Sequence, residues 1–134
     1  MKLLRVTSSD REKWNSLLEQ DLSVSEFTIV LEKSISFFIA TESKIFVGCM
    51  SLFQITEEEA YLDYYINKNF RGRGHSKKAI PELLKFAEEQ LKLSRIKALV
   101  SPENLPSLNI IKELGFELLG NERNLLLFQK KISF

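Results

Sequence analysis

The sequence predicts an α+β protein in which helices pack against one β-sheet, and two patterns indicate this class. Between residues 36 and 66, three runs rich in aromatic and β-branched residues are joined by short polar turns, as in an antiparallel meander. Between residues 76 and 115, two helical patterns are separated by one strand-like run. The chain of 134 residues has no repeat and no linker-like segment, so residues 1–134 are expected to form a single domain.

The N-terminal part is expected to hold one strand and one or two helices. Residues 3–6 (LLRV) have the composition of a short strand. Ser9 and Glu12 have the spacing of a capping box, and Trp14, Leu17 and Leu18 then share one helical face, so a helix is expected from Ser9 onward. The pattern of residues 21–33 is ambiguous and predicts only a short second helix around residues 26–31.

The remaining elements follow from periodicity. The three meander strands are residues 36–41, 45–55 and 60–66. Residues 76–93 form a helix because apolar residues recur at near-helical spacing, and residues 94–100 form the next strand. The last helix has Leu108, Ile111 and Leu114 as its apolar stripe and ends at Gly115. Residues 116–132 then form two strands around the polar turn GNER, which gives the order β-α-(α)-β-β-β-α-β-α-β-β.

Composition excludes several classes of protein. Nineteen Lys and Arg residues balance eighteen Asp and Glu residues, so bulk charge favours neither nucleic acid nor membrane. The N-terminus has no hydrophobic signal core, and no apolar run approaches the roughly 18 residues of a membrane span. Cys49, the lone cysteine, lies in an apolar run and is expected to be a small buried side chain. We therefore predict a cytoplasmic protein without a disulfide or a metal site.

The segment INKNFRGRGHSKKA, residues 66–79, places Gly72 and Gly74 between a strand and a helix. Backbone N–H groups at such a junction converge with the positive end of the helix dipole, and this arrangement binds phosphate. A basic surface turn is the alternative. The segment matches neither the Walker motif, which needs a glycine directly before Lys-Ser/Thr, nor the dinucleotide motif, whose third glycine is replaced by Lys77.

Two blocks in the chain resemble the GNAT superfamily of acetyl-CoA-dependent N-acetyltransferases. Arg71-x-x-Gly74-x-Ser76 is similar to that family's arginine/glutamine-x-x-glycine-x-glycine/alanine signature. About thirty residues later, SPENLPSLNIIKELGFELLG resembles its second block, with Asn104, Ser107 and the helix end KELGFE. The resemblance extends from about Ser36 to Ile132, and the second block looks most like the ribosomal-protein-alanine (RimJ/RimL-type) branch.

The resemblance implies a mixed, mostly antiparallel, twisted sheet of six to seven strands, with a cofactor cleft between strands four and five. In this family the loop amides hold the pyrophosphate of CoA, and the pantetheine arm pairs with strand-four backbone. No metal is implied. The residues that the resemblance assigns to acetyl-CoA are Tyr65, Ile66, Arg71, Gly72, Arg73, Gly74, His75, Ser76, Lys77 and Asn104.

The chain departs from the family pattern at four positions. Ser76 replaces a smaller residue in the phosphate loop, and Pro81 removes a backbone donor inside the following helix. Ile111 stands where many members carry a tyrosine that protonates the leaving thiolate, and Leu99 stands where some carry a glutamate base. The general acid and the general base are therefore not given by the resemblance alone.

Ser107 and Asp63 are the candidate catalytic residues. Ser107 is a candidate general acid, although a small residue packed near the CoA sulfur is the competing interpretation. Asp63 is a candidate base or amine-orienting group, and by strand alternation it shares a face with Tyr65 while Tyr64 points to the other. Water, or the turn glutamates at 57–59, are the alternatives for the base.

The expected function is transfer of an acetyl group from acetyl-CoA to a primary amine by direct attack. The acceptor side, residues 13–31 and the last hairpin, is short, and this favours a protein N-terminus or another exposed amine. The missing tyrosine and glutamate leave a catalytically silent acyl-CoA-binding sensor as an alternative. A nucleic-acid-binding domain that uses KNFRGRGHSKK is a third, and a homodimer is left open.

Overall fold

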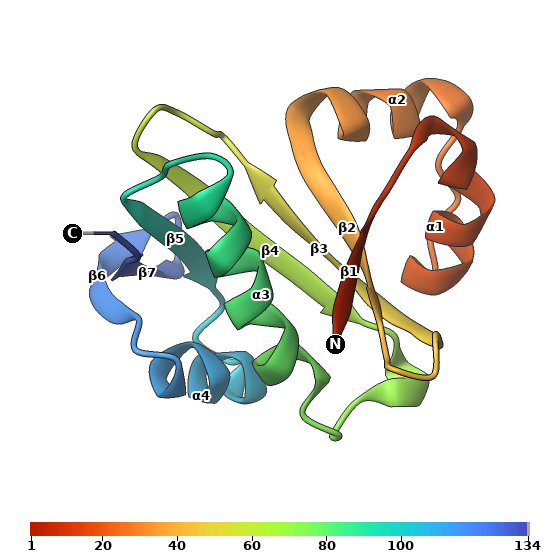
Figure 1. The fold of residues 1–134 in the computed structure, drawn as a ribbon. Coiled ribbons are helices and arrows are strands. Elements are labelled where there is room, and N and C mark those ends of the chain that lie inside the picture. Colours follow the sequence, from red (N-terminus) through yellow and green to blue (C-terminus); the bar gives the residue numbers. More distant parts are fainter. Residues whose placement is uncertain (134) are drawn as a thin grey trace.

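The computed structural model describes residues 1–133, which fold into a seven-stranded sheet with four α-helices (Figure 1). Short 3₁₀ turns at Ser8–Asp10 and Lys68–Phe70 complete the secondary structure of this part of the chain. The elements are β1 (Lys2–Arg5), α1 (Arg11–Leu18), α2 (Val24–Lys33), β2 (Ser34–Ala40), β3 (Phe46–Phe53), β4 (Glu59–Ile66), α3 (His75–Glu89), β5 (Arg95–Val100), α4 (Leu105–Glu113), β6 (Glu117–Glu122) and β7 (Leu125–Lys131).

The strands are arranged in the order β1-β2-β3-β4-β5-β7-β6. β2, β3 and β4 form the predicted antiparallel meander, and the β3–β4 register runs unbroken from the Gly48–Ile66 pair to the Phe53–Tyr61 pair. Within residues 1–133, the β4–β5 pair alone is parallel. The predicted α+β fold, with a mixed and mostly antiparallel sheet, is therefore confirmed.

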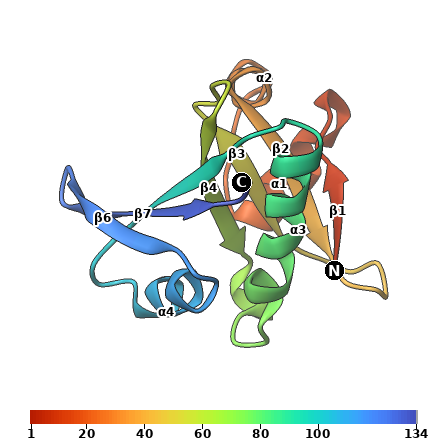
Figure 2. The same cartoon turned by 60° about the vertical axis from the view of Figure 1, so that its left-hand side comes forward.

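β4 and β5 separate soon after they pair. Only Glu59–Tyr61 of β4 lies opposite β5, against residues 95–97. Beyond Tyr61, β4 stays beside β3, whereas β5 continues beside β7 as far as Val100. Figure 2 shows the group β5, β6 and β7 turned away from β3 and β4. The C-terminal half of β4 is left with an open edge toward β5.

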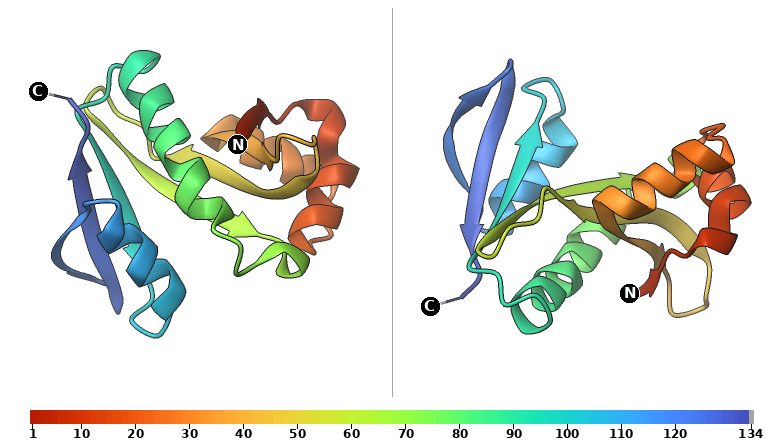
Figure 3. Two further views of the ribbon diagram at one scale, coloured as in Figure 1. Left: turned by 60° about the horizontal axis from the view of Figure 1, so that its bottom comes forward. Right: turned by 90° about the horizontal axis from the view of Figure 1, so that it is seen from above.

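Helices cover both faces of the sheet, and each face has its own core. α3 and α4 pack on one face in a large cluster that includes Ile80, Leu83 and Ile111, all fully buried. α1 and α2 pack on the other face in a smaller cluster around Trp14 and Phe38. The two layers are visible in Figure 3. Burial of each large aliphatic side chain contributes about 1.5–3 kcal/mol to stability, so these clusters fix the sheet between its helices.

Cys49 lies in the smaller cluster and is only 2% exposed. Burial raises the pKa of its thiol far above the usual range, so the sulfur stays protonated and unreactive. The prediction of a small buried side chain is confirmed.

Local details differ from the sequence prediction near the N-terminus. The capping box that we placed at Ser9 and Glu12 lies two residues earlier, where the Asp10 carboxylate accepts a hydrogen bond from the Thr7 N–H (2.8 Å). The sequence contains two overlapping capping-box patterns, Thr7-x-x-Asp10 and Ser9-x-x-Glu12. The 3₁₀ turn Ser8–Asp10 begins directly after Thr7, so the first pattern forms the box. The second helix is longer than predicted because Ser23 and Glu26 form a reciprocal capping box at its start.

α3 continues through Pro81 without interruption of the element, and Gly115 ends α4 with φ +86°, as its sequence position predicted. None of the helices within residues 1–133 combines the length and the hydropathy that a membrane span requires.

Candidate active site

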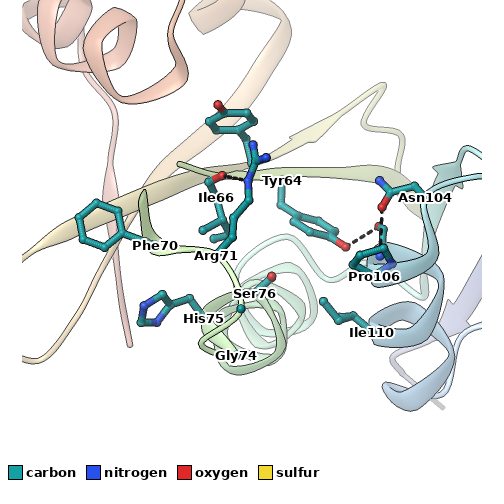
Figure 4. Close-up of a pocket in the computed structure, with 13 residues that line it drawn as sticks. Tyr64, Ile66, Phe70, Arg71, Gly74, His75, Ser76, Asn104, Pro106 and Ile110 are labelled. Carbon is teal, nitrogen blue, oxygen red and sulfur yellow. Dashed lines mark hydrogen bonds between the residues drawn. The ribbon is translucent and has the colours of Figure 1, made fainter. Parts of the chain in front are cut away.

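A cleft of about 490 Å³ opens where β4 and β5 part (Figure 4). Its walls come from three parts of the chain: the C-terminal end of β4, the glycine loop with the start of α3, and the start of α4. The lining residues are Tyr64, Tyr65, Ile66, Phe70, Arg71, Gly72, Gly74, His75, Ser76, Asn104, Pro106, Ser107 and Ile110. All of the predicted acetyl-CoA residues except Arg73 and Lys77 are therefore brought together in one place, together with Ser107.

The glycine loop has a backbone conformation that other residues rarely adopt. Gly72 and Gly74 have φ angles of +77° and +76°, and Gly74 is the N-cap of α3. A Cβ atom added at either glycine would meet no heavy atom within 4 Å. Packing within the protein therefore does not require these glycines. Glycine is required here because the backbone has positive φ angles, which other residues rarely adopt. The space beside both glycines is open, so a ligand placed there could contact the free amides at the N-terminus of α3.

The cationic side chains of the loop are mostly engaged within the protein. Arg71 donates from Nε to the Ile66 carbonyl (2.8 Å), and its guanidinium lies over the Tyr65 ring. Arg73 lies over the Phe70 ring, and Lys77 pairs with Glu113 of α4 (2.8 Å). Anion binding by this loop would therefore rest mainly on backbone amides, and of these three cationic side chains only that of Arg71 lines the cleft.

The β3–β4 register determines which backbone groups of β4 face the cleft. In an antiparallel pair, the N–H and C=O of one residue point to the same side, and successive residues alternate. The Asn67 N–H donates to the Val47 carbonyl (2.8 Å), so the amide of Tyr65, two residues earlier, also faces β3. Tyr64 and Ile66 consequently turn their backbone groups to the open edge, whereas the backbone groups of Tyr65, which the resemblance assigned to acetyl-CoA, face β3.

Gly48 of β3 allows this part of β4 to lie close. A Cβ at position 48 would be only 2.1 Å from the Tyr65 carbonyl oxygen. Since no side chain fits there, the glycine is required for the position of the open edge.

Asp63 lies at the same open edge. Its side chain starts on the α1–α2 face of the sheet, because Asp63 shares a face with Tyr65, whose partner Cys49 lies in the smaller cluster. Its carboxylate accepts a hydrogen bond from the Tyr64 N–H (2.9 Å), and Asp63 is not among the residues that line the cleft. Among residues 1–133 the carboxylate has no ion-pair partner. Although the Asp63 side chain is exposed, the neighbouring protein removes part of its hydration and raises the pKa of its carboxyl, while the Tyr64 N–H opposes that rise. A cationic or polar ligand on this face would find an uncompensated carboxylate.

The turn glutamates are placed differently. Glu59 accepts hydrogen bonds from Arg95 and Lys97 (2.7 and 3.1 Å), and Glu58 pairs with Arg95. The hydrogen bond from Lys97 is the main reason that the pKa of Glu59 is lowered. Glu58 and Glu59 lie at the end of β4 that pairs with β5, and neither lines the cleft.

The start of α4 forms the wall opposite β4. Asn104 caps this helix, and its side-chain oxygen accepts from the Ser107 N–H (3.3 Å). Asn104 thus caps α4 and also lines the cleft. The Ser107 hydroxyl forms a hydrogen bond with the Tyr64 hydroxyl (2.5 Å).

Sequence analysis did not identify Tyr64, Phe70, Pro106 or Ile110 as site residues. Strand alternation already placed Tyr64 on the face opposite Asp63, which is the face that α3 and α4 cover. Its contact with α4 could not be foreseen, because that contact depends on the angle at which β4 and β5 part. Ile111, by contrast, is fully buried and does not line the cleft.

Known proteins resemble this chain in sequence and in fold. The family model described as "Acetyltransferase (GNAT) domain" matches residues 3–117. The chain belongs to the GNAT acetyltransferase family. It is 32% identical over 107 residues to a probable N-acetyltransferase, YjcK, of Bacillus subtilis (strain 168), in an alignment that covers 75% of this chain and 59% of that protein. The chain thus spans little more than half the length of that relative.

Solved structures of two other GNAT proteins share the fold. One is a chimera that contains spermidine N-acetyltransferase SpeG of Vibrio cholerae, with a TM-score of 0.84, 17% identity and coverage of 98% of this chain and 97% of that one. The other is the N-acetyltransferase PseH of Campylobacter jejuni in complex with acetyl coenzyme A, with a TM-score of 0.75, 20% identity and coverage of 98% and 99%. At such identities the likeness establishes the fold.

His75, the first residue of α3, gives a testable pH dependence. Burial, reinforced by Arg73 and Lys78, holds the pKa of its imidazole below the usual value, so the ring is neutral at pH 7. A bound diphosphate would favour the charged ring and raise this pKa, so that binding takes up a proton. We therefore expect the affinity for acetyl-CoA to increase as the pH falls through the interval between the two pKa values.

The measurement is titration calorimetry at about pH 5.5 and 7.5 on the wild type and His75→Gln. The phosphomonoester of CoA also titrates near pH 6, and the difference between the two proteins removes its contribution. An identical pH dependence in both proteins would mean that His75 does not face the diphosphate.

Proposed function

We propose that residues 1–134 act as one unit that transfers an acetyl group from acetyl-CoA to a primary amine by direct attack. The observation that carries the proposal is the parting of β4 and β5. It places an open strand edge, a glycine loop at a helix N-terminus and the capped start of α4 around one cleft. These are the three groups that an extended thioester with a diphosphate tail requires.

Each part of acetyl-CoA has a matching part of the cleft. The amides of Gly72, Gly74 and the first residues of α3 suit the diphosphate. The Tyr64 carbonyl and the Ile66 N–H suit the amide groups of the pantetheine arm, because the Tyr64 N–H donates to Asp63 and the Ile66 carbonyl accepts from Arg71. Phe70, Pro106 and Ile110 supply apolar surface. The Ser76 hydroxyl, at a buried position at the start of α3, adds a donor where the family signature has a smaller residue.

Acetyl transfer needs a neutral amine, and Asp63 is the group best placed to provide it. Primary amines are protonated at neutral pH, so one proton must leave before the nitrogen attacks the carbonyl carbon. An ionised, unpaired carboxylate at the open edge of β4 attracts the ammonium group and can accept that proton. The nitrogen then forms the new C–N bond, the C–S bond breaks as the sulfur departs, and the nitrogen loses its second proton to water, which leaves the acetylated amine.

For the acceptor, we propose a protein N-terminus, as in the ribosomal-protein-alanine branch that the second sequence block resembles. A small amine is the second candidate, because SpeG, which shares the fold, is named for spermidine. The Asp63 carboxylate at the open edge could bind the ammonium group of either a protein N-terminus or a small amine.

Release of free CoA thiol tests the function directly. The assay contains acetyl-CoA with a peptide that begins with alanine, the same peptide with a blocked N-terminus, or spermidine. We expect release that depends on a free amine and is absent with the blocked peptide. Tight binding of acetyl-CoA without acceptor-dependent release for any amine would favour the silent acyl-CoA sensor.

A further inference from the structure

The hydrogen bond between Tyr64 and Ser107 joins the two walls of the cleft. The Tyr64 hydroxyl lies 2.5 Å from the Ser107 Oγ, across the gap where β4 and β5 no longer pair (Figure 4). Tyr64 comes from the open edge of β4, and Ser107 comes from the first turn of α4. Both side chains line the cleft, so this pair of hydroxyls is in the position where the substrate thioester would lie between the walls.

Of the two hydroxyls, the phenol is the better source of a proton. A phenol has a pKa near 10, close to that of a thiol, whereas an aliphatic hydroxyl such as that of Ser107 is a poor acid. Burial raises the pKa of Tyr64, and the neighbouring Asp63 adds to the rise, while the hydrogen bond with Ser107 opposes it. The phenol therefore holds its proton at neutral pH.

The family pattern places a tyrosine that acts as the acid at one position of α4, but this chain has Ile111 there. Ile111 cannot donate a proton, is fully buried in the large core and does not line the cleft. The cleft nevertheless contains a phenol, which reaches it from the opposite wall.

We propose that Tyr64 is the acid that protonates the departing CoA thiolate, with Ser107 as the residue that positions its hydroxyl. The inference rests on the proposed acetyl transfer. As the C–S bond breaks, its electron pair goes to sulfur. The phenol O–H bond breaks and an S–H bond forms, which leaves CoA as the thiol and Tyr64 as phenolate. The Ser107 hydroxyl donates a hydrogen bond to the phenolate until solvent water restores its proton.

Ser107 is revised by this assignment from a candidate acid to a positioning residue. The competing explanation is that the hydrogen bond is purely structural and holds the two walls of the cleft at a fixed distance. Loss of a structural hydrogen bond would weaken acetyl-CoA binding and lower thermal stability. Loss of a proton donor would instead lower the rate of thiol release at saturating acetyl-CoA.

The experiment compares Tyr64→Phe, Ser107→Ala and the double variant. Tyr64→Phe should lower kcat by about 100-fold or more, within the usual range for loss of a general acid, while the dissociation constant of acetyl-CoA changes less than about threefold. Ser107→Ala should lower kcat by about 10- to 100-fold, since it removes one hydrogen bond to a charged group. The double variant should be no slower than Tyr64→Phe, because both changes act on one proton transfer.

A fluorinated tyrosine at position 64 separates the two explanations further. It keeps the ring and the hydroxyl but lowers the phenol pKa, so the alkaline limb of the kcat profile should move to lower pH. The other titratable or charged side chains that line this cleft are Tyr65, Arg71 and His75, and Asp63 lies beside it; all four are unchanged in that variant. An unshifted alkaline limb, or a Tyr64→Phe protein with wild-type kcat, overturns the role of Tyr64 alone. A wild type that binds acetyl-CoA but releases no thiol with any amine overturns the proposed function and this inference together.

Discussion

Replacing Gly74 with valine is expected to weaken acetyl-CoA binding by on the order of 100-fold while the sheet and helices remain folded. Gly74 has φ +76°, a region that costs a β-branched residue about 1–3 kcal/mol. Relief of that strain would turn the amides at the start of α3 away from the diphosphate. Each hydrogen bond to a charged group is worth about 1.5–3 kcal/mol, so the loss of one or two accounts for the expected change.

Gly115→Val is the matched control for this variant. Gly115 has φ +86° and ends α4 outside the cleft lining, so the substitution carries similar backbone strain. It also brings a Cβ within 2.8 Å of the Lys130 Nζ, a flexible side-chain end that can move. We expect Gly115→Val to lower the melting temperature but to keep wild-type affinity for acetyl-CoA in calorimetry. If Gly74→Val bound acetyl-CoA as tightly as the control, the loop would not be the phosphate site.

Features with a local cause could be predicted from the sequence. The meander strands and α3 follow from the spacing of apolar residues, and Gly115 ends α4 because only a glycine easily takes that backbone conformation. The glycine loop could be located because its function, as proposed, depends on main-chain groups at a strand–helix junction. Such a junction is visible in the sequence itself.

Features that depend on distant parts of the chain could not be predicted. Whether Tyr64 or Tyr65 turns its amide to the cleft depends on the β3–β4 register, which a single strand does not reveal. Lys77 lies next to the glycine loop in sequence, but its ammonium pairs with Glu113 on another helix. The Tyr64–Ser107 contact joins residues 43 positions apart, and it requires both the parting of β4 from β5 and the placement of α4.

Asp63→Asn is expected to lower kcat/KM by about 10²–10⁴-fold, the usual contribution of a general base. Partial desolvation by the neighbouring protein raises the pKa of the exposed Asp63 carboxyl, and the residue must be ionised to accept a proton. The wild-type rate should therefore fall as the pH drops through this raised pKa. Steady-state kinetics across pH should show this acidic limb in the wild type and not in Asp63→Asn.

The same substitution is expected to stabilise the protein slightly at neutral pH, and this separates loss of function from misfolding. A raised pKa means that the folded state binds the proton more tightly than the unfolded state, so stability falls as the pH rises through the interval between the two pKa values. Above that interval the ionised Asp63 costs stability. Asparagine removes the charge, and its side-chain oxygen can still accept from the Tyr64 N–H.

Glu42→Gln, a change of the same kind at an exposed residue between β2 and β3, should leave both rate and melting temperature unchanged. An Asp63→Asn protein that melts higher yet retains the wild-type rate and acidic limb would assign the base to water.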